Sequence, residues 1–159
     1  MSISTISESE INFQFESNKL YRIEDEEFYK NLTGVKVVDF IALKDDSIYF
    51  IEAKKTVPIK DKYSDLVEKL IGSILMFVGS LNGRKNTIPN LMPENFKPAL
   101  LKKSKVYYII IINDLNLEWL PYLSSFLQTE LSPICNAFSI ESTLILDKNQ
   151  YKKLGFKIK

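Results

Sequence analysis

The sequence has no histidine and only one cysteine, Cys135, among its 159 residues. Without histidine the chain cannot form a Ser-His or Cys-His nucleophilic site, and one cysteine cannot complete a zinc site. A single cysteine also excludes an intrachain disulfide, which fits a reducing cytoplasm. Any chemistry must therefore use carboxylates, lysines, hydroxyls or a hard, oxygen-binding metal such as Mg²⁺.

Long apolar runs are also lacking, because LIGSILMFVGSL and VYYIIII are too short to cross a bilayer. The start, MSISTISESE, has neither the basic nor the apolar region of a secretory signal. The net charge is only +1, although lysines cluster at 54–62, 96–105 and 148–159, which is a weak indication of a phosphate-binding face. We expect a soluble, cytoplasmic protein with no membrane partner, folded as a single domain over residues 1–159.

Hydrophobic periodicity predicts a mixed α/β fold, a small β-sheet flanked by helices. The run VYYIIIIN at 106–113 has no alternation, which is typical of a central strand covered on both faces. A long stretch at 82–105 with three prolines shows no periodicity and is predicted to be a loop. Further strands are expected at 11–17, 19–24, 34–43, 47–55 and 142–147; helices are expected at 24–32, at 64–81 with Ser64 as N-cap, at 116–131, and in a short tail at 149–156.

Three charged residues interrupt the apolar hairpin VDFIALKDDSIYFIEAKK at 38–55. A two- or four-residue loop places Asp39 directly opposite Glu52, with side chains about 5 Å apart, and Lys54 shares their face because side chains alternate along a strand. Opposed carboxylates need a proton or a positive charge between them; Lys54 is a candidate for part of that charge, and a bound divalent cation such as Mg²⁺ would satisfy the rest. A three- or five-residue loop would instead move Asp39 out of line. The plainer alternative is an ion pair between Asp39 and Lys54, with Glu52 facing solvent.

The order of these residues resembles the core motif of the PD-(D/E)XK nuclease superfamily. An apolar strand carries Asp39, a short hairpin follows, and Glu52-Ala53-Lys54 ends the next apolar strand; Val38 stands where the family has a proline. The resemblance implies a restriction-endonuclease-like αβββαβ core. It also implies that the Asp39 and Glu52 carboxylates and the Ala53 carbonyl bind the metal, and that Lys54 is catalytic.

Many members of that superfamily have another glutamate on the first helix. Glu24, Glu26 and Glu27 all lie in the right neighbourhood, and we choose Glu27 as the candidate fourth catalytic residue. Lys69, on the long helix, could face the site, but the sequence favours a solvent-exposed lysine beside Glu68.

The resemblance implies a Mg²⁺- or Mn²⁺-dependent nuclease that hydrolyses phosphodiester bonds, with DNA favoured over RNA, in a defence, repair or mobile-element context. Its small size and near-neutral charge suggest that a homodimer or a partner protein directs it. The alternative is a catalytically silent module on the same fold that binds nucleic acid or protein. A third possibility is an accessory protein of an unrelated α/β fold.

Overall fold

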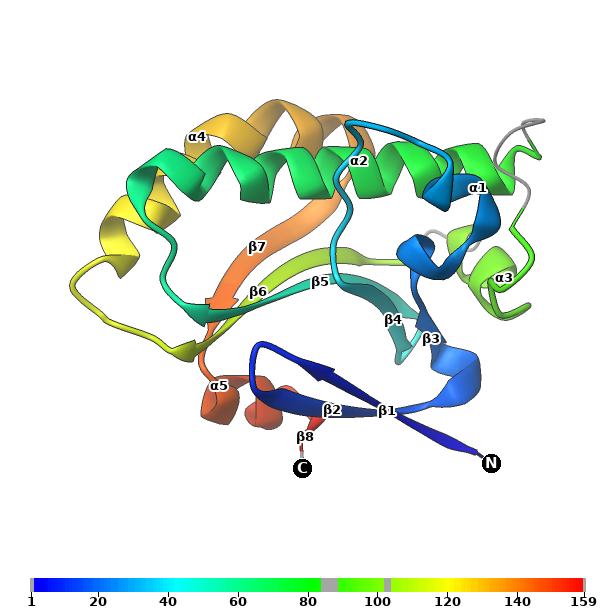
Figure 1. Cartoon of the computed structure of the whole chain (residues 1–159), viewed down its shortest axis with the longest axis horizontal. Coiled ribbons are helices and arrows are strands. Elements are labelled where there is room, and N and C mark those ends of the chain that lie inside the picture. The colour runs from blue at the N-terminus through cyan, green and yellow to red at the C-terminus, as the bar shows by residue number, and fades with distance from the viewer. Residues whose placement is uncertain (1, 84–88, 102–103, 159) are drawn as a thin grey trace.

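A computed structural model describes residues 2–83, 89–101 and 104–158. Its centre is a five-stranded mixed sheet with the strand order β3-β4-β5-β6-β7 (Figure 1). The first three strands pair antiparallel, and β5, β6 and β7 run parallel, joined by helical crossovers. These strands span Leu20–Tyr21 (β3), Phe40–Lys44 (β4), Ser47–Thr56 (β5), Val106–Asp114 (β6) and Ile140–Leu146 (β7).

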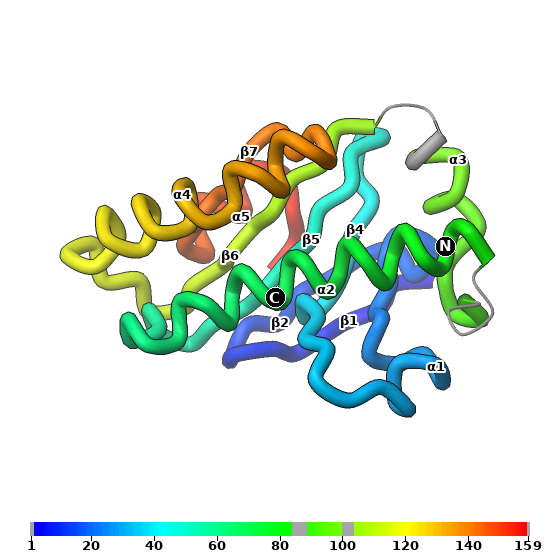
Figure 2. The backbone as a smooth tube through the Cα atoms, turned by 90° about the horizontal axis from the view of Figure 1, so that it is seen from above, coloured from blue at the N-terminus to red at the C-terminus, as the bar shows by residue number. Residues whose placement is uncertain are grey.

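Two long helices, α2 (Tyr63–Leu81) and α4 (Leu120–Phe138), cover one face of this sheet. Figure 2 shows them crossing over the strands side by side. Each helix presents leucines at helical spacing to the sheet, which makes this the larger of two apolar cores. In α2 the buried stripe consists of Leu66, Leu70, Ile74 and Phe77.

The opposite face of the sheet is covered by a second, three-stranded antiparallel sheet of order β1-β2-β8 and by helix α5 (Figure 1). Aromatic side chains fill the space between the two sheets, with Phe13 packing edge-on against both Phe40 and Tyr151. The strands are Ile3–Glu8 (β1), Ile11–Glu16 (β2) and Lys157–Ile158 (β8), and α5 is Lys148–Lys153.

Strand β6 is buried on both faces, which confirms the prediction from its unbroken apolar run. Tyr108, Ile110 and Ile112 belong to the core under the long helices, whereas Ile109 and Ile111 belong to the core against the second sheet. The sheet is therefore a middle layer, and any charged side chain on its central strands must lie within a core.

The remaining segments are short. Helix α1 is Glu27–Lys30, α3 is Phe96–Leu101, and three 3₁₀ turns lie at Ser17–Lys19 (η1), Ile23–Asp25 (η2) and Lys60–Lys62 (η3). Helix α3 corrects the prediction that 82–105 has no secondary structure, although 84–88 and 102–103 lie outside the described residues. Helix α1 is much shorter than predicted, because Glu26 keeps an extended backbone conformation and separates it from η2.

Strands β1 and β8 were not predicted. The sequence of β1, ISTISE, is polar on most positions and buries only Ile6, so its apolar alternation is weak. Helix α4 continues past the predicted end at 131 and through Pro133. Because Pro133 and Thr129 are both exposed, the carbonyl that loses its N–H donor can bond to water.

Among the described residues, no helix is long and apolar enough to cross a membrane. Helix α2 begins at Tyr63, with Lys62 at its N-cap position and no capping side chain. The predicted cap residue Ser64 lies inside the first turn instead.

Candidate active site

The hairpin at 38–55 has the register that a two-residue loop requires. Lys44 pairs with Ser47 and Phe40 with Ile51, so the pairing leads directly to Asp39 and Glu52 just beyond the end of the ladder. Asp45 and Asp46 form the loop, and both have positive φ angles (48° and 57°), as the turn favoured by twisted antiparallel strands demands. The predicted register of the hairpin is confirmed, and Asp39 lies one residue before β4, just outside the paired residues.

The charged side chains of the hairpin point to the face that α2 covers. Along β5 the side chains alternate, with Ile48 and Phe50 in the core beneath the long helices and Ile51 and Ala53 in the core against the second sheet. Glu52 follows the first set, and its side chain is completely buried. The alternative in which Glu52 faces solvent is therefore wrong.

Two lysines contact the buried carboxylate from different elements. Lys54 Nζ, from the same strand, and Lys69 Nζ, from α2, each lie 2.6 Å from Glu52 Oε1. Lys69 Nζ also lies 3.5 Å from Asp39 Oδ1, so it contacts both acids. The other oxygen of Glu52, Oε2, is buried and has no hydrogen-bond partner within the part of the chain that the structure describes. The cluster of Asp39, Glu52, Lys54 and Lys69, called the charged cluster below, is thus two acids and two bases with one unpartnered oxygen.

The backbone of Ala53 connects the charged cluster to two other segments. Its N–H donates to Asp39 Oδ2 at 2.7 Å. This hydrogen bond joins the two arms of the hairpin beyond the last pair of strand residues. Its carbonyl oxygen accepts from the Ser9 hydroxyl at 3.0 Å. Ser9 lies in the turn between β1 and β2 with a φ of 51°, so the tip of the N-terminal hairpin reaches the strand that carries the site.

Burial is the largest influence on ionisation in the charged cluster. It raises the pKa of Glu52, and the negative charge of Asp39 adds to this effect, whereas Lys69 and Lys54 act in the opposite direction. Burial by itself would lower the pKa of Lys69, but the charges of Glu52 and Asp39 outweigh it, so the pKa is raised. Lys69 is therefore a stable cation at neutral pH.

The position of Lys69 corrects the prediction that it is a solvent-exposed lysine beside Glu68. Glu68 instead pairs with Lys36 at the surface. Two small residues follow Lys69 on the same side of α2, at spacings of three and four. Gly72 lies against the backbone of Lys36, and Ser73 Oγ accepts a 2.7 Å hydrogen bond from Val38 N, one residue before Asp39.

These small residues are the signal in the sequence that would have located Lys69. A second stripe of Lys, Gly and Ser at positions i, i+3 and i+4 indicates that this side of the helix lies close to another backbone. The apolar stripe alone does not show it, because Lys69 lies at the edge of that stripe.

The structure does not bring Glu27 into the charged cluster. Glu27 is exposed in α1, and among the described residues it has no ion pair with Lys54 or Lys69. Glu24 pairs with Arg22. The first helix is only one turn long here, so it cannot carry a glutamate towards β5 as a longer helix would.

Glu26 is fully buried but has a different partner set. Three donors reach its carboxylate, namely the Tyr21 hydroxyl at 3.1 Å and the backbone N–H groups of Asn90 (3.1 Å) and Leu91 (3.0 Å). Glu26 thus anchors the segment that leads to α3. Within the described residues, no set of three or more acidic, cysteine or histidine side chains could hold a metal ion.

Two of the three lysine clusters of the sequence lie on different sides of the central sheet. The segment 54–62 adjoins the charged cluster, and a hollow there is lined by Lys54, Lys55 and Lys62. The C-terminal lysines are carried by α5 and β8, which lie on the other side of the central sheet (Figure 1). The C-terminal lysines therefore lie away from the charged cluster, whereas the cluster at 96–105 includes Lys102 and Lys103, which lie outside the described residues.

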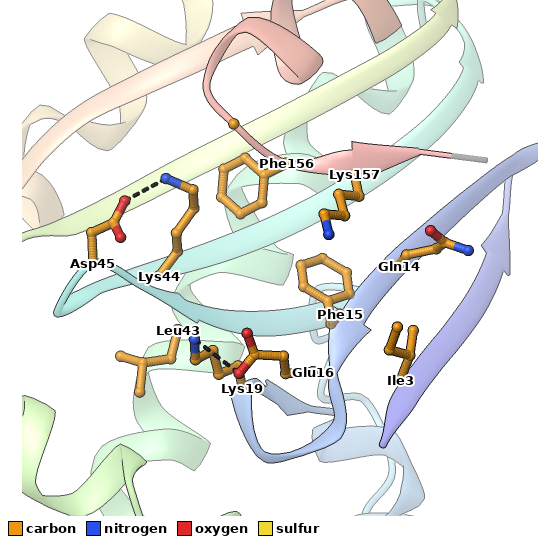
Figure 3. Close-up of a pocket in the computed structure, with 11 residues that line it drawn as sticks. Ile3, Gln14, Phe15, Glu16, Lys19, Leu43, Lys44, Asp45, Phe156 and Lys157 are labelled. Carbon is orange, nitrogen blue, oxygen red and sulfur yellow. Dashed lines mark hydrogen bonds and ion pairs between the residues drawn. The ribbon is translucent and has the colours of Figure 1, made fainter. Parts of the chain in front are cut away.

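A separate hollow lies between the two sheets, at the hairpin end of β4 and β5 (Figure 3). Phe15 and Phe156 line its apolar part, and Lys44 Nζ lies 5.7 Å from the Phe156 ring centroid. Four of the charged groups that line it form two ion pairs, Lys44 with Asp45 and Lys19 with Glu16, and Lys157 lines it as well. None of the residues of the charged cluster lines this hollow.

Comparison of the chain with protein-family models, with curated proteins and with solved structures found no match. The functional assignment therefore depends on the chemistry of the charged cluster.

Proposed function

We propose that the protein is a metal-dependent nuclease that hydrolyses phosphodiester bonds, most simply in DNA, with the charged cluster as its active site. The observation that carries this proposal is the unpartnered, buried Oε2 atom of Glu52, beside Asp39 and Lys54 on one face of the sheet. A buried carboxylate oxygen without a donor is costly, and a bound cation would satisfy it.

The strand order also supports the proposal. Strands β3, β4 and β5 pair antiparallel in series, and α2 then connects β5 to the parallel strand β6. This arrangement agrees with the βββαβ part of a restriction-endonuclease-like core. The helix expected before the first of these strands is absent from the described residues, where η1 precedes β3 and the short α1 follows it.

The residues present fit a divalent cation with few protein ligands. Asp39 Oδ1 and Glu52 Oε2 are the carboxylate oxygens not fully occupied by N–H donors, and Mg²⁺ in enzymes takes one or two carboxylates and keeps several waters. The Ala53 carbonyl could contribute if Ser9 released it. Such a cation supplies a bound water of lowered pKa and polarises a phosphoryl oxygen.

The lysines of the chain have their own roles. Lys54 Nζ is held beside Glu52, and its side chain remains about one-third exposed, so it can reach a phosphate that approaches from solvent. There it would stabilise charge that develops on the phosphoryl oxygens or orient the attacking water. Lys55, the next residue, pairs with Glu10 at the surface and has no part in this chemistry.

The test is an assay of cleavage on linear and circular double-stranded DNA, single-stranded DNA and RNA, with Mg²⁺ or Mn²⁺ and with EDTA. Lys54→Ala and Asp39→Asn should each lower the cleavage rate at least about 100-fold, because each removes a group that acts on the transition state. Lys152→Ala, at an exposed position of α5 on the other side of the central sheet, is the matched control and should keep the wild-type rate. Cleavage that persists in EDTA and in Lys54→Ala would refute the proposal.

A second candidate, a catalytically silent module that binds nucleic acid or protein, is favoured by one observation. Lys54 and Lys69 already balance the charges of Asp39 and Glu52, so the charged cluster is neutral without a metal. Binding to nucleic acid with no cleavage under either metal would support this candidate.

A further inference from the structure

The ammonium group of Lys69 occupies the space between the two carboxylates of the charged cluster. Its Nζ lies 2.6 Å from Glu52 Oε1 and 3.5 Å from Asp39 Oδ1. Among the described residues, Lys54 forms an ion pair with Glu52 but none with Asp39. Lys69 is thus the cation that the folded chain itself supplies to both acids.

The acceptor atoms of the two acids are unequally occupied. Glu52 Oε1 receives both lysines, and Asp39 Oδ2 accepts from Ala53 N at 2.7 Å. This leaves Glu52 Oε2, which is unpartnered, and Asp39 Oδ1, whose nearest ion-pair partner is Lys69. A divalent cation shared by the two acids must use these two oxygens, so it must lie next to the Lys69 ammonium.

We propose that Lys69 is an internal competitor of the divalent cation, and that cation binding requires its ammonium to move away from Asp39. This inference rests on the proposed function, since it assumes that the charged cluster binds a metal. An ammonium and a dication a few ångströms apart repel each other, and the repulsion is strong here because Glu52 is fully buried and Lys69 is only 22% exposed. The cation therefore binds less tightly than the two carboxylates alone would allow.

Two neighbouring residues of α2 fix the position of the Lys69 backbone. Ser73, one turn further along α2, accepts from the backbone N–H of Val38, next to Asp39. Gly72 packs against the Lys36 carbonyl, which fixes the distance between the helix and the segment before β4 that carries Asp39. The base of the Lys69 side chain is thus fixed, whereas its ammonium can rotate towards solvent, and this is the movement that cation binding requires.

The experiment measures Mn²⁺ binding by electron paramagnetic resonance and by calorimetry, without substrate. Lys69→Met removes the competing charge and should tighten Mn²⁺ binding at least about tenfold relative to wild type. Lys69→Arg keeps the charge and should bind no more tightly than wild type. Lys62→Met removes an exposed lysine outside the charged cluster, so it measures the general effect of lost positive charge and should change affinity less than about threefold.

Thermal denaturation gives the same comparison if Lys69→Met is unstable without metal. A ligand that binds the folded state stabilises it in proportion to its affinity, so Mn²⁺ should raise the Tm of Lys69→Met more than that of wild type. If wild type binds Mn²⁺ and Lys69→Met binds it with equal or lower affinity, this inference is overturned and the proposed function stays intact. Absence of Mn²⁺ binding in both proteins would overturn both.

Discussion

Replacing Gly72 with alanine should destabilise the protein, although alanine is the better helix former. A Cβ atom at Gly72 would lie 2.0 Å from the carbonyl oxygen of Lys36 and 3.3 Å from Val35 Cγ1. The first contact is with backbone, so no side-chain rotation can relieve it. Helix α2 or the segment before β4 must therefore move by at least about 1.4 Å to reach an ordinary contact.

The size of the effect follows from three contributions. Alanine favours the helix by about 1 kcal/mol relative to glycine. Forcing atoms into a packed interface costs about 1–3 kcal/mol. The displacement also stretches the hydrogen bond from Val38 N to Ser73 Oγ, which is 2.7 Å long and buried, and an unsatisfied buried N–H costs about 1–3 kcal/mol. We expect a net loss of about 1–5 kcal/mol in the free energy of unfolding, centred near 3 kcal/mol.

Urea denaturation followed by circular dichroism measures this loss as a lower midpoint at an unchanged slope. Ser64→Ala, at an exposed position in the first turn of the same helix, is the matched control and should change stability by no more than about 0.5 kcal/mol. If Gly72→Ala were as stable as wild type or more stable, α2 would not pack against this backbone. The placement of Lys69 beside Asp39 would then be wrong as well.

Two further substitutions test other parts of the structure by the same denaturation assay. Glu26→Gln should lower the free energy of unfolding by about 1–3 kcal/mol, because three N–H and O–H donors converge on that buried carboxylate and the new amide nitrogen cannot accept from any of them. Glu27→Gln, at the exposed neighbouring position, is the control and should have little effect. Equal stability of the two variants would contradict the anchoring role of Glu26. Asp46→Gly should stabilise the protein by up to about 1 kcal/mol, since glycine adopts the positive φ of this turn position without steric cost. Asp46→Ala is the control and should not increase stability. A more stable alanine variant would contradict the left-handed conformation at Asp46.

The hairpin that carries the charged cluster could be predicted in detail because its constraints are local. Side chains alternate along a strand, and a two-residue loop at Asp45-Asp46 leaves one register, so the positions of Asp39, Glu52 and Lys54 on one face follow from counting. The buried strand β6 could likewise be predicted, because the unbroken apolar run VYYIIII has no solvated face.

The rest depended on how segments distant in the sequence approach one another. Lys69 enters the cluster because Gly72 and Ser73 let α2 lie against the backbone before β4, and hydrophobic periodicity reports only the centre of the buried stripe. Glu26 and Glu27 are adjacent acids in the sequence, yet one is buried under three donors and the other is exposed.

The sequence by itself thus determined the face and register of Asp39, Glu52 and Lys54, since these depend on backbone geometry within one hairpin. Only the tertiary structure decided that a second lysine reaches both acids, that Ser9 contacts the Ala53 carbonyl, and that no acid from the first helix joins them. These contacts join residues far apart in the chain, and their geometry is set by the packing of helices and sheets rather than by any local pattern.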